Sequence, residues 1–170
     1  MRNTEVNAEH LKFMNMAVKC SSDNLKTNLG GPFGAIIVKN GKVIACEGNT
    51  VTSSNDPTAH AEVNAIRAAC QALKSPDLEG CIMYTSCEPC PMCTSAIYWA
   101  QINVVYYGNT KTDAEWAGFS DTFITEELAK PLTGRKVQFK RIGASDAIRV
   151  FEQWMQKTDD EKDATKKGTL

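Results

Sequence analysis

Residues 81–107 read CIMYTSCEPCPMCTSAIYWAQINVVYY and hold two apolar runs on either side of a cysteine-rich turn and an apolar segment. The run from Cys81 to Thr85 predicts a buried strand, and Val104 to Tyr107 predicts a second one. Between them, prolines precede a helix expected from about Pro91 to Ala100, because proline lacks a donor that the first helical turn does not use. This order favours parallel strands with a helix packed on one face of the sheet.

The upstream sequence predicts one helix, a hairpin and a second helix. Apolar side chains recur at helical spacing from about Glu9 to Leu25, which indicates an amphipathic helix. Strand-like runs at Phe33 to Val38 and Lys42 to Cys46 flank Asn40-Gly41, a pair that suits a two-residue hairpin turn. A polar loop then leads to a helix from about Ala59 to Leu73. The sheet is therefore expected to begin antiparallel and to become parallel.

The downstream sequence predicts shorter elements and a tail. An aromatic loop and a short helix are expected from Asp113 to Leu128, a last strand at Val137 to Arg141, and a last helix at Asp146 to Met155. From Lys157 onward the charged sequence has no apolar periodicity and buries too little surface to offset its ordering entropy. We therefore expect one domain over residues 1–156 and a disordered tail over 157–170.

The composition indicates a soluble globular protein. Of the 170 residues, 42% are hydrophobic and 23% are charged, as is usual for such proteins. No apolar run approaches the roughly 20 residues of a membrane span, and no signal or transit peptide is visible at the N-terminus. A cytoplasmic location is therefore expected. The net charge of -1 offers no basic surface for phosphate backbones, so no nucleic-acid partner is expected.

The cysteines are interpreted as thiols rather than as a disulfide framework. Their odd count of seven and the missing signal peptide both favour reduced cysteines. The cluster of Cys87, Cys90 and Cys93 is a candidate for metal binding. The remaining four lie in apolar stretches and are predicted to fill the core; they are Cys20, Cys46, Cys70 and Cys81.

The strongest chemical signal combines His60-Ala61-Glu62, at the start of one predicted helix, with Pro89-Cys90-Pro91-Met92-Cys93 at the start of another. Together they match the H-x-E and P-C-x-x-C pattern of zinc deaminases. The two cysteines lie one turn apart at a helix N-terminus, whose positive end favours thiolates. The histidine can supply a third ligand from the same end of the sheet. Three protein ligands leave tetrahedral zinc one open position, as a catalytic site requires.

Glu62 is the expected proton carrier, because a carboxylate beside a zinc-activated water can take its proton and deliver it later. Two alternatives stay open. Glu62 could be an ordinary solvent-facing helix residue. Cys87 could complete a closed site of three cysteines and His60, which would make a non-catalytic structural zinc module. Cys87 precedes the helix start, so an unligated thiol is favoured. No role is assigned to His10.

Several stretches resemble the cytidine-deaminase-like superfamily, and within it the small bacterial-type guanine deaminases and the plant guanosine deaminases. The resemblance covers roughly Leu11 to Trp154. It implies a three-layer α/β/α sandwich around a five-stranded mixed sheet, a zinc cofactor and a homodimer. The stretches that carry it are Gly31 to Gly34, Asn55 to Glu62, Tyr84 to Cys93, Ala96 to Ala100, and Ala117 to Asp121.

The same resemblance implies a role for each candidate residue. His60, Cys90 and Cys93 would bind zinc, and Glu62 would shuttle protons. A carboxylate at Asp121 would face the donor-rich N1 and N2 edge of guanine, because it only accepts hydrogen bonds. Core packing is the alternative for the aromatic residues and helix capping for Asp121. The implied contacts to the purine come from Phe33, Asn49, Ala61, Trp99 and Asp121.

The implied activity is hydrolytic deamination of a small-molecule purine by zinc-activated water, converting guanine to xanthine and ammonia. Guanosine and other bases or nucleosides stay open as substrates. A tRNA adenosine deaminase shares the two motifs, but it would need basic surface for the tRNA phosphates.

Overall fold

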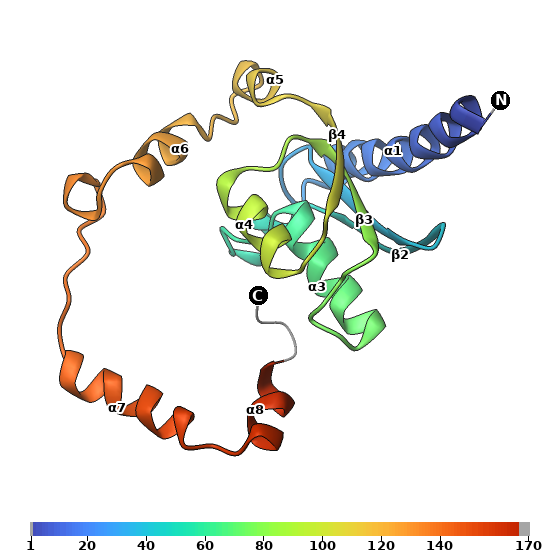
Figure 1. Ribbon diagram of the computed structural model, residues 1–170. Helices are drawn as coiled ribbons and strands as arrows, with labels where there is room; N and C mark the ends of the chain where they lie inside the picture. Colours follow the sequence, from blue (N-terminus) through green and yellow to red (C-terminus); the bar gives the residue numbers. More distant parts are fainter. Residues whose placement is uncertain (1, 167–170) are drawn as a thin grey trace. The chain divides into compact units, whose positions relative to one another are not determined.

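The computed structural model describes the backbone of residues 2–166 and the side chains of residues 8–162. These residues form two compact units, one ending at Asp121 and the other beginning at Thr122. The candidate metal ligands all lie in the first unit. Its elements, most of which are labelled in Figure 1, are α1 (Arg2–Thr27), β1 (Gly34–Lys39), β2 (Lys42–Gly48), α2 (Val51–Ser54), α3 (Ala61–Leu73), β3 (Cys81–Cys87), α4 (Pro91–Trp99), β4 (Val104–Asn109) and α5 (Lys111–Trp116).

The described strands form one mixed sheet in the order β2-β1-β3-β4. Strand β1 is antiparallel to β2 and β3, whereas β3 and β4 are parallel. The predicted hairpin is confirmed, since Asn40 and Gly41 connect β1 to β2 with φ of 51° and 73°. The parallel pair is confirmed as well, with α4 as its crossover. The sheet is therefore antiparallel on the β1 side of β3 and parallel on its β4 side.

Helices cover the sheet on both faces, in the predicted α/β/α order of layers. Alternate side chains of β1 point to opposite faces. Ala35 and Ile37 belong to a core cluster with residues of α3 and α4. Ile36 and Val38 belong to a second cluster with Phe13 and Ala17 of α1. Residues 34–38 of β1 are apolar and buried on both faces, and β1 is an inner strand of the sheet.

A polar contact also holds α1 on the sheet. His10 Nδ1 lies 2.6 Å from the hydroxyl of Tyr84, and its Nε2 lies 3.3 Å from the hydroxyl of Tyr106. The two tyrosine rings stack with their centroids 5.2 Å apart. Burial raises the pKa of Tyr84 to about 12, so this phenol stays protonated. His10, to which the sequence assigns no role, is therefore a residue that joins α1 to β3 and β4.

The second unit corrects the predicted number of strands. Residues 137–141 form no strand, so the sheet in the described residues has four strands and not the five that the resemblance implies. Val137 and Phe139 alternate with polar residues, but both are more than half exposed. Alternation gives a segment the propensity for a strand, whereas a strand also needs a neighbouring strand to pair with.

The helices of the second unit are α6 (Thr122–Ala129), the short 3₁₀ helix η1 (Leu132–Gly134), α7 (Ala144–Met155) and α8 (Asp159–Lys166). The predicted last helix is present as α7. A helix also occurs where a disordered tail is predicted, and its start is capped by hydrogen bonds between Thr158 and Glu161. The assignment of residues 1–156 to one domain stays a prediction.

One pair of cysteines corrects the expectation of reduced core thiols. Cys20 of α1 and Cys46 of β2 form a disulfide. Cys46 pairs with Ile36 in the hairpin, so its side chain points to the face that α1 covers. In contrast, Cys81 is buried against α3 and Cys70 packs beside it, as predicted. No helix in the described part of the chain combines the length and hydrophobicity needed to cross a bilayer.

Candidate metal centre

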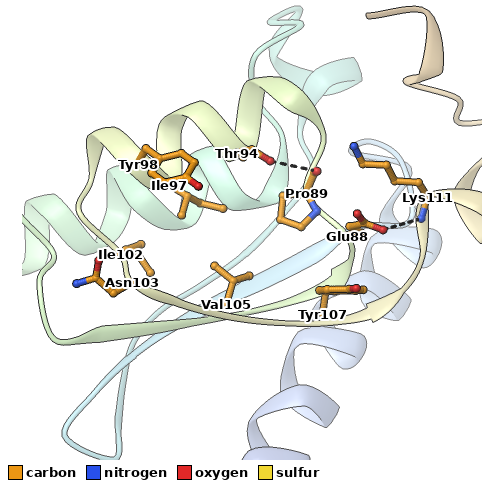
Figure 2. A pocket seen from close by; sticks show the side chains of 10 residues that line it. All are labelled: Glu88, Pro89, Thr94, Ile97, Tyr98, Ile102, Asn103, Val105, Tyr107 and Lys111. Atoms are coloured by element: carbon orange, nitrogen blue, oxygen red, sulfur yellow. Dashed lines mark hydrogen bonds between the residues drawn. The ribbon is translucent and has the colours of Figure 1, made fainter. Parts of the chain in front are cut away.

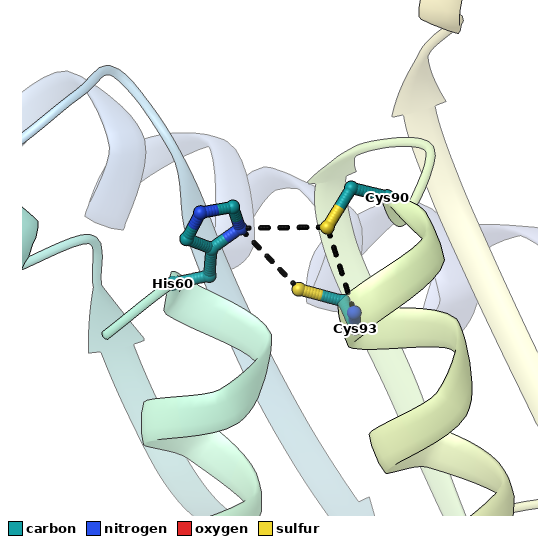
Figure 3. Close-up of side chains that lie close together, drawn as sticks. All are labelled: His60, Cys90 and Cys93. Carbon is teal, nitrogen blue, oxygen red and sulfur yellow. Dashed lines mark hydrogen bonds between the residues drawn. The ribbon is translucent and has the colours of Figure 1, made fainter. Parts of the chain in front are cut away.

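The three candidate ligands meet because both helices that carry them begin at the same place. His60 is the N-cap residue of α3 and Cys90 is the N-cap residue of α4. Figure 3 shows the imidazole facing both cysteines at the start of α4. The distance from His60 Nδ1 is 3.6 Å to Sγ of Cys90 and 3.5 Å to Sγ of Cys93. The backbone N–H of Cys93 also donates to the Cys90 sulfur, which holds the two cysteines in place.

The donor set and its spacing fit zinc. Zinc binds thiolate sulfur at about 2.3 Å and imidazole nitrogen at about 2.0–2.1 Å, so a tetrahedral site separates the two ligand atoms by roughly 3.5 Å. The sulfur–nitrogen distances given above agree with this value. Among the described residues, the only group of potential metal ligands that meets at one point consists of His60, Cys90 and Cys93.

Cys87 lies outside this group. It ends β3, is buried, and its thiol donates to the backbone carbonyl of Thr110 at 3.7 Å. Burial raises the pKa of the Cys87 thiol to about 11, so this residue stays protonated. The structure therefore favours three protein ligands over the closed four-ligand alternative.

The three candidate ligands also shift one another's pKa values. A hydrogen bond from the Cys93 thiol, reinforced by His60, lowers the pKa of Cys90 to about 4 against the opposing effect of burial. The same hydrogen bond and burial raise the pKa of Cys93. The contact with Cys90 raises the pKa of His60. The site thus holds protons between its sulfur and nitrogen atoms, and a metal ion would replace them.

Glu62 points into the protein rather than toward bulk solvent. It is only 6% exposed, in the first turn of α3. The hydroxyl of Thr85 donates to its Oε1 at 3.2 Å, and the thiol of Cys93 donates to its Oε2 at 3.5 Å. Burial raises the pKa of Glu62, which suits a group that must take up a proton as well as release it. The alternative of a solvent-facing helix residue is wrong.

Comparison with known proteins then decides the family. Residues 7–109 match the cytidine and deoxycytidylate deaminase zinc-binding region, and this span contains all three ligands and Glu62. The chain belongs to this deaminase family. It is a zinc-dependent hydrolytic deaminase, and the three residues that converge in the structure are positioned to hold the zinc.

Relatives of this deaminase differ in how much of the chain they match. A guanine deaminase from Bacillus subtilis is 49% identical over 145 residues, which is 85% of this chain and 93% of the relative. The X-ray structure of guanine deaminase from Bacillus subtilis covers 88% of this chain and 96% of its own, with 47% identity and a TM-score of 0.85. A tRNA-specific adenosine deaminase from Agrobacterium fabrum is 44% identical over 102 residues, or 59% of this chain and 66% of its own.

Two of the residues predicted to contact the purine lie side by side in the deaminase. The backbone N–H of Asn49 donates to the carbonyl of Phe33 at 3.1 Å. The side-chain Oδ1 of Asn49 accepts from the N–H groups of Gly31 at 3.3 Å and Val51 at 3.1 Å. Because its oxygen is occupied in this way, the Nδ2 group of Asn49 is the end that can donate to a ligand.

The sequence did not reveal the two asparagines that hold this loop. Asn24 of α1 is 5% exposed, and its Nδ2 donates to the carbonyls of Gly31 and Asn49, each at 2.7 Å. Asn64 of α3 donates to the carbonyl of Gly48 at 2.9 Å and to Oγ1 of Thr50 at 3.0 Å. In the sequence, each is only an amide side chain on an amphipathic helix. That pattern does not indicate which distant backbone group the amide will bind.

The other predicted contacts occupy different surroundings, and their roles stay predictions. Ala61, the first residue of α3, is fully buried. Trp99 ends α4 and is 58% exposed. Asp121 forms an ion pair with Lys111, with 3.7 Å between Oδ2 and Nζ.

A separate groove of about 550 Å³ lies between α4 and β4. Figure 2 shows Ile97 and Tyr98 of α4 on one side of it and Val105 and Tyr107 of β4 on the other. None of the zinc ligands lines this groove.

Proposed function

We propose that this deaminase converts guanine and water to xanthine and ammonia. The observation that carries the proposal is the buried carboxylate of Glu62 beside three convergent zinc ligands, in a chain that resembles guanine deaminase along most of its length. The tRNA-specific relative matches a smaller part of the chain, and the net charge of -1 does not suit a tRNA substrate.

The proposed reaction uses Glu62 as its proton carrier. His60, Cys90 and Cys93 would hold the zinc, which when bound would supply a Lewis acid that makes a water molecule nucleophilic at neutral pH. Glu62 accepts a proton from the water that attacks C2 of guanine and passes it to the ring nitrogen N3. It then carries the second proton to the 2-amino group, which leaves as ammonia. The hydrogen bond from Thr85 to Oε1 keeps the other oxygen turned toward the metal ligands.

Recognition of guanine is assigned to residues around this centre. Asp121 accepts hydrogen bonds from N1–H and the 2-amino group, and the Nδ2 group of Asn49 donates to an acceptor of the purine. Adenine has an acceptor at N1 and is disfavoured beside a carboxylate. The remaining contacts are packing contacts with the purine ring, from Phe33, Ala61 and Trp99.

The test is ammonia release from guanine, guanosine, adenine, cytosine and tRNA, each incubated with the zinc-loaded protein. We expect guanine to have the highest kcat/KM, with xanthine as its product by absorbance and chromatography. A higher kcat/KM for guanosine would assign the site to the nucleoside. Release from adenine, cytosine or tRNA, with none from guanine, would contradict the proposal.

We also propose that the enzyme is a homodimer and acts in the cytoplasm. Support for a dimer comes from apolar side chains that are exposed along α4 and β4, since large exposed apolar patches are usual at subunit contacts. Tyr98 is 67% exposed and Tyr107 is 49% exposed. A reducing cytoplasm would keep Cys90 and Cys93 available to zinc.

The dimer has a direct measurement. Sedimentation velocity at micromolar concentration is expected to give twice the chain mass, and Tyr98→Glu together with Tyr107→Glu is expected to shift the protein toward the monomer. A wild-type chain that sediments as a monomer at all concentrations contradicts the dimer and leaves the proposed activity untouched.

A further inference from the structure

Lys111 forms an ion pair with the residue assigned to guanine recognition. It is the first residue of α5, and Asp121 ends the loop that follows this helix. The Lys111 side chain is 38% exposed and that of Asp121 is 18% exposed, so the pair lies at the edge of the protein surface. The ion pair therefore links the two ends of the segment from residue 111 to residue 121.

The position of Lys111 is fixed by the loop that carries the zinc ligands. Its backbone N–H donates to Oε2 of Glu88 at 3.2 Å, a contact drawn in Figure 2. The backbone N–H of Glu88 donates in turn to the carbonyl of Asn109 at 2.8 Å. Thr110 and Asp113 form a capping box that starts α5 at this point. Glu88 lies two residues before Cys90, so the backbone of Lys111 is anchored close to the metal centre.

The segment has a second anchor beside the predicted purine contacts. The ring of Phe119 meets the ring of Phe33 edge to face, with 5.0 Å between their centroids. The loop thus reaches the purine side of the site through Phe119, and two residues later it ends at Asp121. The ion pair with Lys111 is one of the contacts that set the direction of that carboxylate.

We propose that Lys111 is a positioning residue that gives the enzyme its selectivity for guanine by aiming the carboxylate of Asp121. The proposal rests on the guanine deaminase function proposed above. The contact with Lys111 is made through Oδ2, and a carboxylate can accept several hydrogen bonds at once, so the same group can face both Lys111 and the N1–H and 2-amino donors of guanine. Lys111 acts through Asp121 and touches no reacting atom.

The test compares guanine with unsubstituted purine, which lacks both the N1–H and the 2-amino donor assigned to Asp121. Lys111→Gln is expected to raise the KM for guanine roughly fivefold, the effect of a partly exposed ion pair, with less than about a twofold change in kcat. The affinity for purine, measured by its competition with guanine, should stay within about twofold of wild type. Lys111→Arg keeps the charge and should restore the guanine KM.

Lys130→Gln is the matched control, because Lys130 pairs with Glu127 in a similarly exposed ion pair outside the zinc centre. It should leave both affinities unchanged. An unchanged guanine KM in Lys111→Gln overturns the inference, as does an equal loss of affinity for both purines, which would indicate general damage to the fold. A wild-type protein that releases no ammonia from guanine overturns the proposed function and this inference together.

Discussion

Replacing Glu62 with glutamine is expected to lower kcat for guanine by roughly 10³-fold, within the range that general acid–base catalysis contributes. The amide matches the carboxylate in shape and can still accept the hydrogen bond from Thr85, but it cannot take up a proton at neutral pH. Zinc content should stay at the wild-type level, because Glu62 is not among the convergent ligands. Steady-state kinetics and metal analysis on the same preparation check both expectations.

The stability of the Glu62→Gln variant separates catalysis from folding. Burial raises the pKa of Glu62 above its value in the unfolded chain, so ionisation of this group lowers the stability of the metal-free protein as the pH rises through that pKa. The neutral amide has no such cost, and the metal-free variant should unfold at the same or a higher temperature at pH 7. Glu79→Gln, a change at an exposed glutamate, serves as the control for activity. Near-normal turnover in Glu62→Gln would remove this residue from the reaction.

Loss of a zinc ligand is expected to abolish activity altogether. Cys90→Ala removes the thiol that is most easily ionised and leaves two protein ligands. We expect the metal content to fall from about one ion per chain to a small fraction of that after dialysis, since two ligands hold zinc far more weakly than three. Turnover should fall with the metal, because no second group of potential metal ligands converges among the described residues.

Cys87→Ala is the matched control for this experiment. Cys87 lies three residues before Cys90, at the end of β3. Its thiol donates to a backbone carbonyl instead of joining the ligand group. Zinc content and kcat should both stay close to wild type. Zinc loss in Cys87→Ala, as complete as in Cys90→Ala, would instead indicate a closed structural site and would count against the hydrolytic mechanism.

The central part of the fold could be predicted because its signals are local. Asn40-Gly41 specifies a turn, Pro91 marks the start of a helix, and the strand between His60 and Cys90 forces both motifs to one end of the sheet. These features depend on backbone preferences of neighbouring residues and on the short connections between them. They were sufficient to predict that His60, Cys90, Cys93 and Glu62 would meet at one place.

The remaining features depend on partners that are distant in the sequence. The alternation of Val137 and Phe139 predicts a strand, but pattern alone supplies no neighbour, and the described segment has none. The disulfide between Cys20 and Cys46 follows from the register of the hairpin and from which face α1 covers. In the same way, Asn24 is an unremarkable helix residue until the loop around Asn49 folds back onto it.

The placement of the metal ligands at helix starts has a consequence for how new substrates could arise. His60, Cys90 and Glu62 depend on the sheet and on two helices, whereas three of the five proposed purine contacts, Phe33, Asn49 and Asp121, lie in connecting loops. Under the proposed function, reactivity and most of the recognition are thus encoded by separate parts of the chain. Mutations in the loops are then expected to retarget the enzyme to other amine-bearing rings while its hydrolytic centre is inherited unchanged.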